Sequence, residues 1–322
     1  MSKLQNVVIW IREYKSESLR GSFVICGIFL LLFMTYFLLQ AIIGVIASFT
    51  RRLLEQIINN LLLEYYFYPI FTRGFIAIFS LLFWFLAIKL IVNKHLREYF
   101  HLYKKKEIPI LVFVGVGVSF VGLSSVFLIE TNMNFLVVET WKWNNTDFLS
   151  LSSLIFIALA LNLFVAFFEE LTFRGFLVTK ISEAVNEKYA IIVSAILFSA
   201  VHLLSNEAEG VNLVILFIML LFPGVILAYA YLKTQSLIYP ICLHFAHDLF
   251  ATELYNLSGW VSDSIFGAQT TLNGPIWLIG NSWGIETGLI VIIPYSFWII
   301  GIYFILNLQS KFIVVREKTI GL

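Results

Sequence analysis

Charged residues are scarce in this chain. Lys, Arg, Asp and Glu make up 13% of its 322 residues, whereas 60% are hydrophobic. Because water-soluble domains carry about 25% charged residues, the composition excludes an ordinary soluble domain and fits a chain whose solvent is the bilayer. The formal net charge is only +1, so we expect no nucleic-acid partner.

Cysteines and several catalytic signatures are also few or missing. The two cysteines, Cys26 and Cys242, lie within apolar runs, which excludes a disulfide framework and a thiolate metal site. The chain has no Gly-x-Ser-x-Gly, no His-Glu-x-x-His, no phosphate-binding loop and no plausible nucleophilic Ser or Cys arrangement. A hydrolase built on this sequence therefore needs another set of groups.

Long apolar runs are what the chain does have. Only helices and closed barrels satisfy their backbone hydrogen bonds in lipid, and the runs lack the alternation of barrel strands. Since a span needs about 20 apolar residues, the sequence predicts an all-α, polytopic helical bundle. We expect eight spans, at residues 22–49, 74–92, 108–129, 151–168, 189–204, 211–232, 237–250 and 288–308.

The placement of Lys and Arg predicts the topology. These residues concentrate before the first span, in the second, fourth and sixth loops and in the tail, and cytoplasmic loops favour them. The exception is the first loop, which holds Arg51, Arg52 and Arg73. Eight spans with both termini cytoplasmic fit this pattern. No small-residue cleavage site follows the first span, so we expect it to be retained.

The chain is interpreted as one domain with three parts. Residues 1–150 hold the first three spans, 151–252 a catalytic core of four spans, and 253–322 an extracytoplasmic loop, the eighth span and a tail. Residues 50–66 mix charged residues with Leu and Ile, which is typical of an interfacial helix. Residues 253–284 are expected to form an ordered interfacial loop.

Ionisable residues inside spans are costly and usually functional. The sequence Glu-Glu-Leu-Thr-Phe-Arg begins at Glu169, at the end of a predicted span. On a helix, Glu170 and Arg174 share a face and can pair, whereas Glu169 points elsewhere without a local cation. Such a carboxylate suits a general base, although a solvated ion pair at the membrane boundary is an equally good explanation of these residues alone.

Three of the five histidines lie in predicted spans. His202 alone is better explained as a hydrogen-bonded core residue than as a ligand. His244 and Asp248 are four residues apart and so face the same way, and His247 lies near the same stripe with an ambiguous role. An Asp in a span needs a partner or water, so simple packing explains this group poorly.

Similar depths in the membrane can bring Glu169, His202 and His244 together. The helix that contains Glu169 is expected to continue to a turn near residues 186–188. Glu169 and His202 lie at similar distances from that turn on its two arms, so their levels differ by only about 5 Å. With His244 partway along the seventh span, the three converge if this helical hairpin projects into the cytosol.

Two chemistries use such a set of groups. In one, Glu169, His202 and His244, with Asp248 as a further ligand or orienting group, hold a divalent metal such as zinc that acidifies a water. In the other, Glu169 and His202 activate the water directly while His244 stabilises the oxyanion. Both routes hydrolyse an amide.

The ordered motifs resemble the CPBP family, also called Abi, of CAAX proteases and bacteriocin-processing enzymes, which is related to the Ras-converting prenyl-protein endopeptidase. The resemblance covers about residues 151–250. The motifs are Glu-Glu-x-x-x-Arg at Glu169, Glu170 and Arg174, Phe-x-x-x-His at Phe198 and His202, and His-x-x-x-Asp at His244 and Asp248.

The resemblance implies an intramembrane endopeptidase and a role for each residue. Glu169 would be the catalytic carboxylate, His202 its partner, and His244 with Asp248 the remaining polar wall, with Glu170 and Arg174 in support. Members usually carry Asn at the position of Asp248, and a carboxylate donates no hydrogen bond to an oxyanion unless it is protonated. This departure favours metal ligation slightly, or an adjusted role for the site that involves His247.

The expected substrate is a protein or peptide with a membrane-associated segment, such as a prenyl-type C-terminal peptide. The resemblance implies peptide maturation or bacteriocin self-immunity in a prokaryotic plasma membrane. Two other functions stay open. One is a non-catalytic immunity or scaffold protein, and the other is a proton-coupled transporter, which predicts internal repeats that are not evident.

Overall fold

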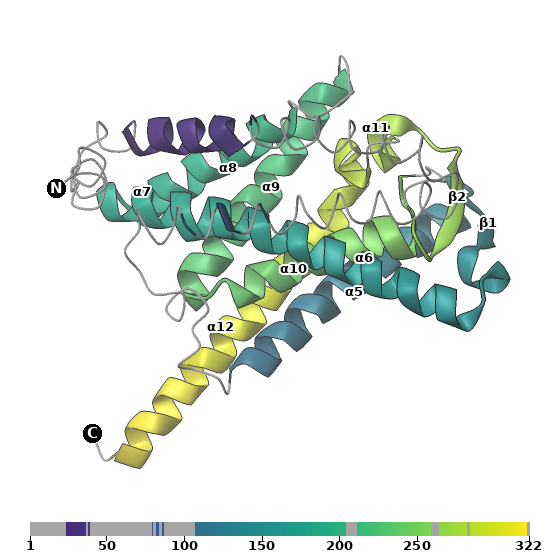
Figure 1. Ribbon diagram of the computed structural model, residues 1–322. Helices are drawn as coiled ribbons and strands as arrows, with labels where there is room; N and C mark the ends of the chain where they lie inside the picture. The colour runs from purple at the N-terminus through teal and green to yellow at the C-terminus, as the bar shows by residue number, and fades with distance from the viewer. Residues whose placement is uncertain are drawn as a thin grey trace, which may run out of the picture.

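The computed structural model describes residues 24–36, 38, 79, 82, 83, 86, 107–203, 211–258, 264–281 and 284–320. Helices dominate this part of the chain, as the sequence predicts (Figure 1). Their bounds, in chain order, are Val24–Tyr36, α5 Ile108–Asn132, η3 Lys142–Asn145, α6 Phe148–Glu170, η4 Leu171–Val178, α7 Thr179–Ala184, α8 Glu187–Leu203, α9 Val211–Thr234, α10 Ile238–Asp248, η5 Leu249–Leu254, α11 Ile276–Ile279, η6 Ile285–Thr287, η7 Leu289–Val291 and α12 Ile292–Ile320.

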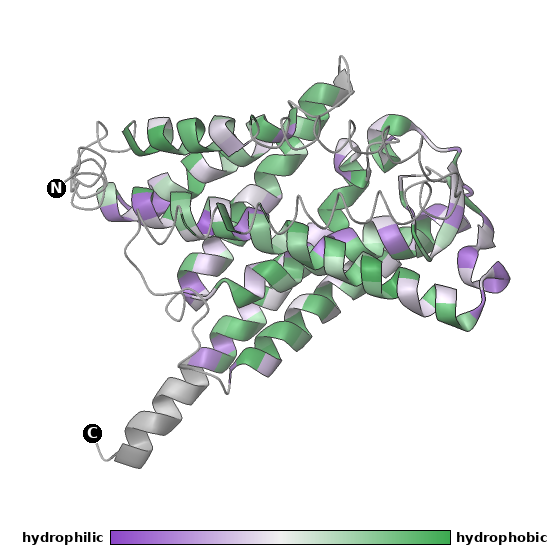
Figure 2. Cartoon of the chain, in the orientation of Figure 1, coloured by the Kyte–Doolittle hydropathy of each residue, from purple (hydrophilic) through white to green (hydrophobic). Residues whose placement is uncertain are grey.

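Four described helices are long and apolar enough to cross a membrane. They are Ile108–Asn132, Phe148–Ala184, Leu213–Thr234 and Leu289–Gln309, and they correspond to the predicted third, fourth, sixth and eighth spans. Figure 2 shows hydrophobic residues along most of α5, α6 and α9. Many apolar side chains of α6 are exposed, among them Phe148, Leu149 and Phe156, as lipid-facing residues are. The helical membrane fold is therefore confirmed.

The other predicted spans have different outcomes. The fifth is α8, of 17 residues, and the seventh is α10, of 11 residues. Both are shorter than the roughly 20 residues that cross a bilayer alone. The first span is described only over 24–36 and residue 38, the second only at 79, 82, 83 and 86, and the interfacial helix at 50–66 lies outside the described residues. A total of eight spans stays a prediction.

The predicted helical hairpin is confirmed. The fourth span continues past Glu170 through η4 and α7, ends at Ala184, and is followed by α8 from Glu187. Asn186 begins the return arm, because its side chain accepts a hydrogen bond from the backbone N–H of Tyr189 at 2.9 Å. The N-terminal helix packs on the outgoing arm, with its Phe29 ring 5.4 Å from that of Phe173 in η4.

A two-stranded antiparallel sheet is the main feature that the sequence does not predict. Strand β1, Leu136–Trp141, pairs with β2, Ala268–Leu272, across more than 120 residues of chain. The pair lies with α11 at the end of the molecule opposite the C-terminus (Figure 1). The predicted loop at 253–284 therefore contains a strand and a short helix, which tie it to the residues that follow α5.

Small residues allow the helices around the site to pack closely. A Cβ at Gly224 in α9 would lie 2.8 Å from Cα of Ala195 in α8. A Cβ at Gly122 in α5 would lie 2.8 Å from Cα of Pro294 in α12. Small residues at helix contacts are typical of membrane bundles, where helices associate through close packing. These contacts set the spacing of α8, α9, α5 and α12.

We expect Gly224→Ala to destabilise the protein by about 1–3 kcal/mol, because the added methyl forces α8 and α9 apart. Thermal unfolding in detergent measures the change. The matched control is Gly117→Ala in α5, where an added Cβ meets nothing within 4 Å. The control should be neutral or slightly stabilising, because Ala favours a helix by about 1 kcal/mol over Gly. Equal stability of the two variants would contradict close packing at Gly224.

Candidate active site

Four polar residues of the three motifs, Glu169, His202, His244 and Asp248, line one cavity of about 190 Å³. It lies among α6, α8, α9, α10, η6 and α12. The polar and aromatic part of its wall consists of Glu169, His202, His244, His247, Asp248, Thr252, Glu286, Tyr295 and Trp298. The apolar part consists of Val165, Phe198, Leu220, Pro223 and Leu227.

Glu169 lies at the centre of the polar groups. Its Oε2 is 3.7 Å from Nε2 of His202 and 3.8 Å from Nε2 of His244, and it has no hydrogen-bond partner among the described residues. These separations are longer than a hydrogen bond and leave room for a bridging water. The helix changes to a π-helix directly after Glu170, a rare geometry that is frequent at functional sites.

His202 is held by its own helix. Its Nδ1 donates to the carbonyl oxygen of Phe198, four residues earlier, at 2.7 Å. A nitrogen that donates to a carbonyl carries the proton, so Nε2 is the nitrogen that faces Glu169. The Phe198 ring packs against the His202 ring, with centroids 4.5 Å apart. Phe198 thus fixes His202 through both its backbone and its side chain.

Glu170 and Arg174 lie behind the cavity and support His244. The two form the buried ion pair that their spacing predicts, at 2.9 Å, with both side chains fully buried. The same Glu170 oxygen accepts from Nδ1 of His244 at 2.9 Å. Arg174 also reaches the carbonyl oxygens of Pro223 and Gly224 in α9, at 3.4 and 3.5 Å. This network ties α6, α9 and α10 together.

Asp248 lies beside His244, as their four-residue spacing predicts. Its Oδ2 is 3.5 Å from Nε2 of His244. A second π-helical segment, η5, begins directly after Asp248, so Glu170 and Asp248 are each the last residue of an α-helix that gives way to a π-helix. Glu169, Glu170 and Asp248 surround His244, and opposite charges stabilise its cationic form.

Glu286 is a site residue that the sequence does not reveal. It lies in the short helix η6, and its Oε1 is 2.8 Å from Nε2 of His247. Burial acts to raise the pKa of Glu286, but its hydrogen bond with His247 and the other local interactions of the carboxylate outweigh burial, so the pKa lies below its ordinary value. Its neighbours on the cavity wall, Tyr295 and Trp298, come from α12. No local spacing relates these residues to the motifs.

The described residues provide donor types that zinc accepts, but not a metal-binding arrangement. No group of three or more His, Cys, Asp or Glu side chains in the described part of the chain is placed so that it could hold a metal ion. The arrangement of these described side chains therefore does not fit a metal as it stands. Metal ligation by Glu169, His202, His244 and Asp248 stays a prediction.

One of three comparisons with known proteins found a match. No curated protein and no solved structure matches the chain. A family model described as "Type II CAAX prenyl endopeptidase Rce1-like" matches residues 151–250, which extend from α6 to the start of η5 and include all three motifs. Glu286, Tyr295 and Trp298 lie beyond the matched segment. The resemblance predicted from the motifs is thus confirmed over residues 151–250, the part of this integral membrane protein that matches the Rce1-like CAAX prenyl endopeptidases.

Proposed function

We propose that this protein is an intramembrane endopeptidase that hydrolyses a peptide bond with a water activated by Glu169. The observation that supports this most is the position of the Glu169 carboxylate, within 3.8 Å of two imidazoles in one cavity. The family match to CAAX prenyl endopeptidases supports a peptide substrate at the membrane.

The reaction follows from the roles that the geometry allows. Glu169 removes a proton from water, assisted by Nε2 of His202, and the hydroxide attacks the carbonyl carbon. The protonated Nε2 of cationic His244 donates to the oxyanion. When the intermediate collapses, the proton held by Glu169 passes to the leaving amine. Glu170, buried against Arg174, keeps the His244 ring in the required orientation.

The apolar wall of the cavity supports a membrane-associated or prenyl-type C-terminal peptide as substrate. Phe198, Leu220 and Leu227 line it beside the polar groups, so it provides contacts for aliphatic side chains next to the bond that is cleaved. The proposed setting is a prokaryotic plasma membrane with both termini cytoplasmic. The proposed role is peptide maturation or bacteriocin self-immunity.

Purified protein in liposomes tests the function. A peptide with a farnesylated CAAX C-terminus and the same peptide without the farnesyl group are incubated with the intact protein and with Glu169→Gln. We expect the intact protein alone to produce a new C-terminus, identified by mass spectrometry, with faster cleavage of the farnesylated peptide. Equal cleavage by both protein forms would contradict the proposal. Proteomic comparison of membranes that contain either form then searches for the natural substrate.

Metal analysis tests the direct route. We expect purified, active protein to contain much less than one divalent metal ion per chain, and to stay active after dialysis against a chelator. One zinc per chain, lost together with activity on chelation, would instead support water activation by a metal at the same residues. Elemental analysis of the active fraction measures this.

A further inference from the structure

A second imidazole–carboxylate pair lies in the cavity and has no part in the proposed reaction. His247 is 4% exposed and its Nε2 is 2.8 Å from Oε1 of Glu286. Its other nitrogen, Nδ1, is buried and has no hydrogen-bond partner among the described residues. Buried polar atoms are nearly always hydrogen-bonded, and His247 is one of the residues that line the cavity, so its unpartnered nitrogen indicates a missing partner.

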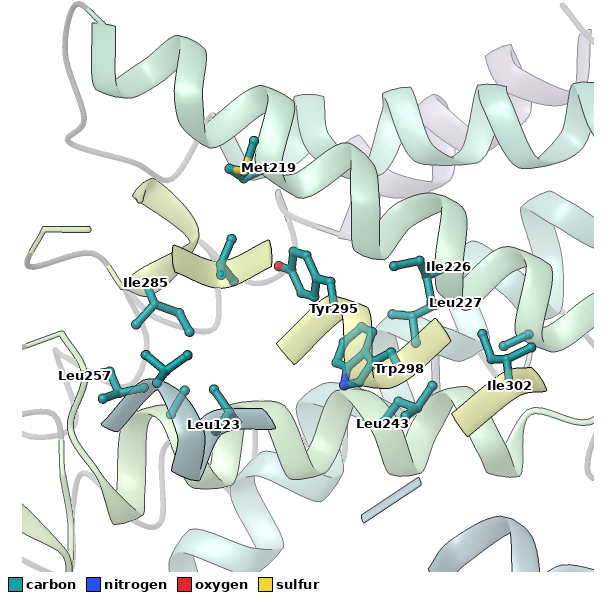
Figure 3. Close-up of a cluster of buried hydrophobic side chains, with 14 of the residues drawn as sticks. Leu123, Met219, Ile226, Leu227, Leu243, Leu257, Ile285, Tyr295, Trp298 and Ile302 are labelled. Carbon is teal, nitrogen blue, oxygen red and sulfur yellow. The ribbon is translucent and has the colours of Figure 1, made fainter. Parts of the chain in front are cut away.

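The ring of His247 is held rigidly by α12. The Tyr295 ring stacks on it with centroids 5.8 Å apart, and the Trp298 ring meets it edge-on at 5.4 Å. The indole N–H of Trp298 donates to Oγ of Ser119 in α5 at 2.9 Å. Figure 3 shows Tyr295 and Trp298 together among the buried side chains of α9, α10 and α12. The aromatic contacts thus fix the plane of the imidazole.

The conformation of the loop before α12 fixes the position of Glu286. Gly284 has a φ of +137°, a backbone conformation that other residues rarely adopt, and a Cβ there would also crowd Oε2 of Glu286. The backbone N–H of Asn281 donates to Oγ1 of Thr287 at 2.8 Å, and this hydroxyl lies 2.8 Å from the carbonyl oxygen of Gly284. These bonds brace the turn around Glu286, as expected where a side chain must be held exactly in place.

Each of the three imidazoles of the cavity is held by a hydrogen bond to one of its ring nitrogens. His202 donates from Nδ1 to a carbonyl and His244 donates from Nδ1 to Glu170, and each presents Nε2 to Glu169. His247 is reversed, with Nε2 held by Glu286 and Nδ1 left over. A carboxylate only accepts hydrogen bonds, so Nε2 of His247 carries the proton. In the neutral ring Nδ1 is then an acceptor.

We propose that Nδ1 of His247 accepts a hydrogen bond from a backbone N–H of the bound peptide, next to the bond that is cleaved, and that Glu286 is the positioning residue that sets this tautomer. The inference rests on the proposed endopeptidase function and assigns part of its substrate binding to residues beyond the family-matched segment. An extended peptide supplies such N–H groups at regular spacing.

A set of N-methylated peptides tests the contact. Each farnesylated CAAX peptide carries one N-methyl group in place of a backbone N–H near the cleavage site, and KM and kcat are measured in liposomes. For the intact protein we expect one position to raise KM about tenfold, because a lost hydrogen bond leaves Nδ1 unpaired. In His247→Leu, the unmethylated peptide should already show the raised KM. The same N-methyl group should then cause no further increase in KM. kcat should change little, because a hydrogen bond made equally in the bound substrate and in the transition state affects KM and not kcat.

Variants of Glu286 separate positioning from folding. Glu286→Leu removes the acceptor and should reproduce the KM of His247→Leu, whereas Glu286→Gln keeps an acceptor oxygen and should stay near the KM of the intact protein. The matched control is Glu130→Leu in α5. Glu130 is a buried carboxylate that does not line the cavity and, unlike Glu286, has no hydrogen-bond partner for its side chain among the described residues. Its variant should keep the intact protein's KM.

The outcomes distinguish the two proposals. If Glu169→Gln is inactive but every N-methyl group has the same effect on the intact protein and on His247→Leu, the His247 contact is wrong and the endopeptidase function stands. If Glu286→Leu does not fold, the comparison of N-methylated peptides on His247→Leu still decides. If the intact protein cleaves none of the peptides, both proposals fail.

Discussion

Glu169→Gln should lower kcat for peptide hydrolysis by about 10³-fold, within the 10²–10⁴ range of general acid–base catalysis. Glutamine has nearly the same shape as glutamate but cannot take a proton from water at neutral pH. Its amide can still occupy the space between Nε2 of His202 and Nε2 of His244. KM should change little, so the loss is one of chemistry and not of binding. Steady-state kinetics in liposomes measure both constants.

The control for this prediction is Glu187→Gln. Glu187 begins α8, at the opposite end from His202, and pairs with Lys233 on the surface at 2.9 Å. Exposed ion pairs contribute little, so this variant should keep the intact protein's kcat and thermal stability. If Glu169→Gln retained more than about a tenth of the intact kcat at normal membrane abundance, catalysis by this carboxylate would be disproved, and another group would have to activate the water.

Arg174→Met should destabilise the protein by about 3–5 kcal/mol, because breaking a buried ion pair by removing one partner is costly. Glu170 is fully buried, and its charged partners are Arg174 and His244, each at 2.9 Å, so the variant leaves it with His244 alone. The change also removes the contacts of the guanidinium with α9 and with the Phe198 ring, 4.8 Å away. We expect a large fall in the thermal unfolding midpoint in detergent and little protein in the membrane fraction.

The double variant Glu170→Gln with Arg174→Met separates the stability lost with the buried ion pair from the stability lost with the packing of the guanidinium. It leaves no buried charge at this position, so much of the lost stability should return. Activity should stay low, because His244 loses the carboxylate that orients its Nδ1. If Arg174→Met were as stable as the intact protein, the buried ion pair would not hold α6 and α9 together. If the double variant were no more stable than Arg174→Met, lost packing would explain the effect.

Local helix geometry explains why much of the site is predictable from sequence. Residues four apart share a face on any α-helix, so the Glu170–Arg174 pair and the approach of Asp248 to His244 require no knowledge of the fold. The hairpin places Glu169 and His202 at one depth, because both are counted in residues from the same turn. The catalytic roles of these residues remain predictions.

Other parts of the site have no local signal. Strand β1 pairs with a strand more than 120 residues away, and short strands among apolar helices show no clear alternation. No local pattern marks Glu286, which becomes a site residue only because its loop packs against α10. The sequence leaves the role of His247 ambiguous for the same reason, because its partner comes from a segment 39 residues away.

The sequence by itself determined that the chain is a helical membrane protein, where the 151–250 segment lies, and which motif residues pair along one helix, because hydropathy and helical periodicity act over short distances. The tertiary structure alone decided that Glu286, Tyr295 and Trp298 complete the cavity and that His247 is turned toward Glu286. Those contacts depend on how α12 and its preceding loop pack against α10 and α9, and that packing is set by the whole bundle.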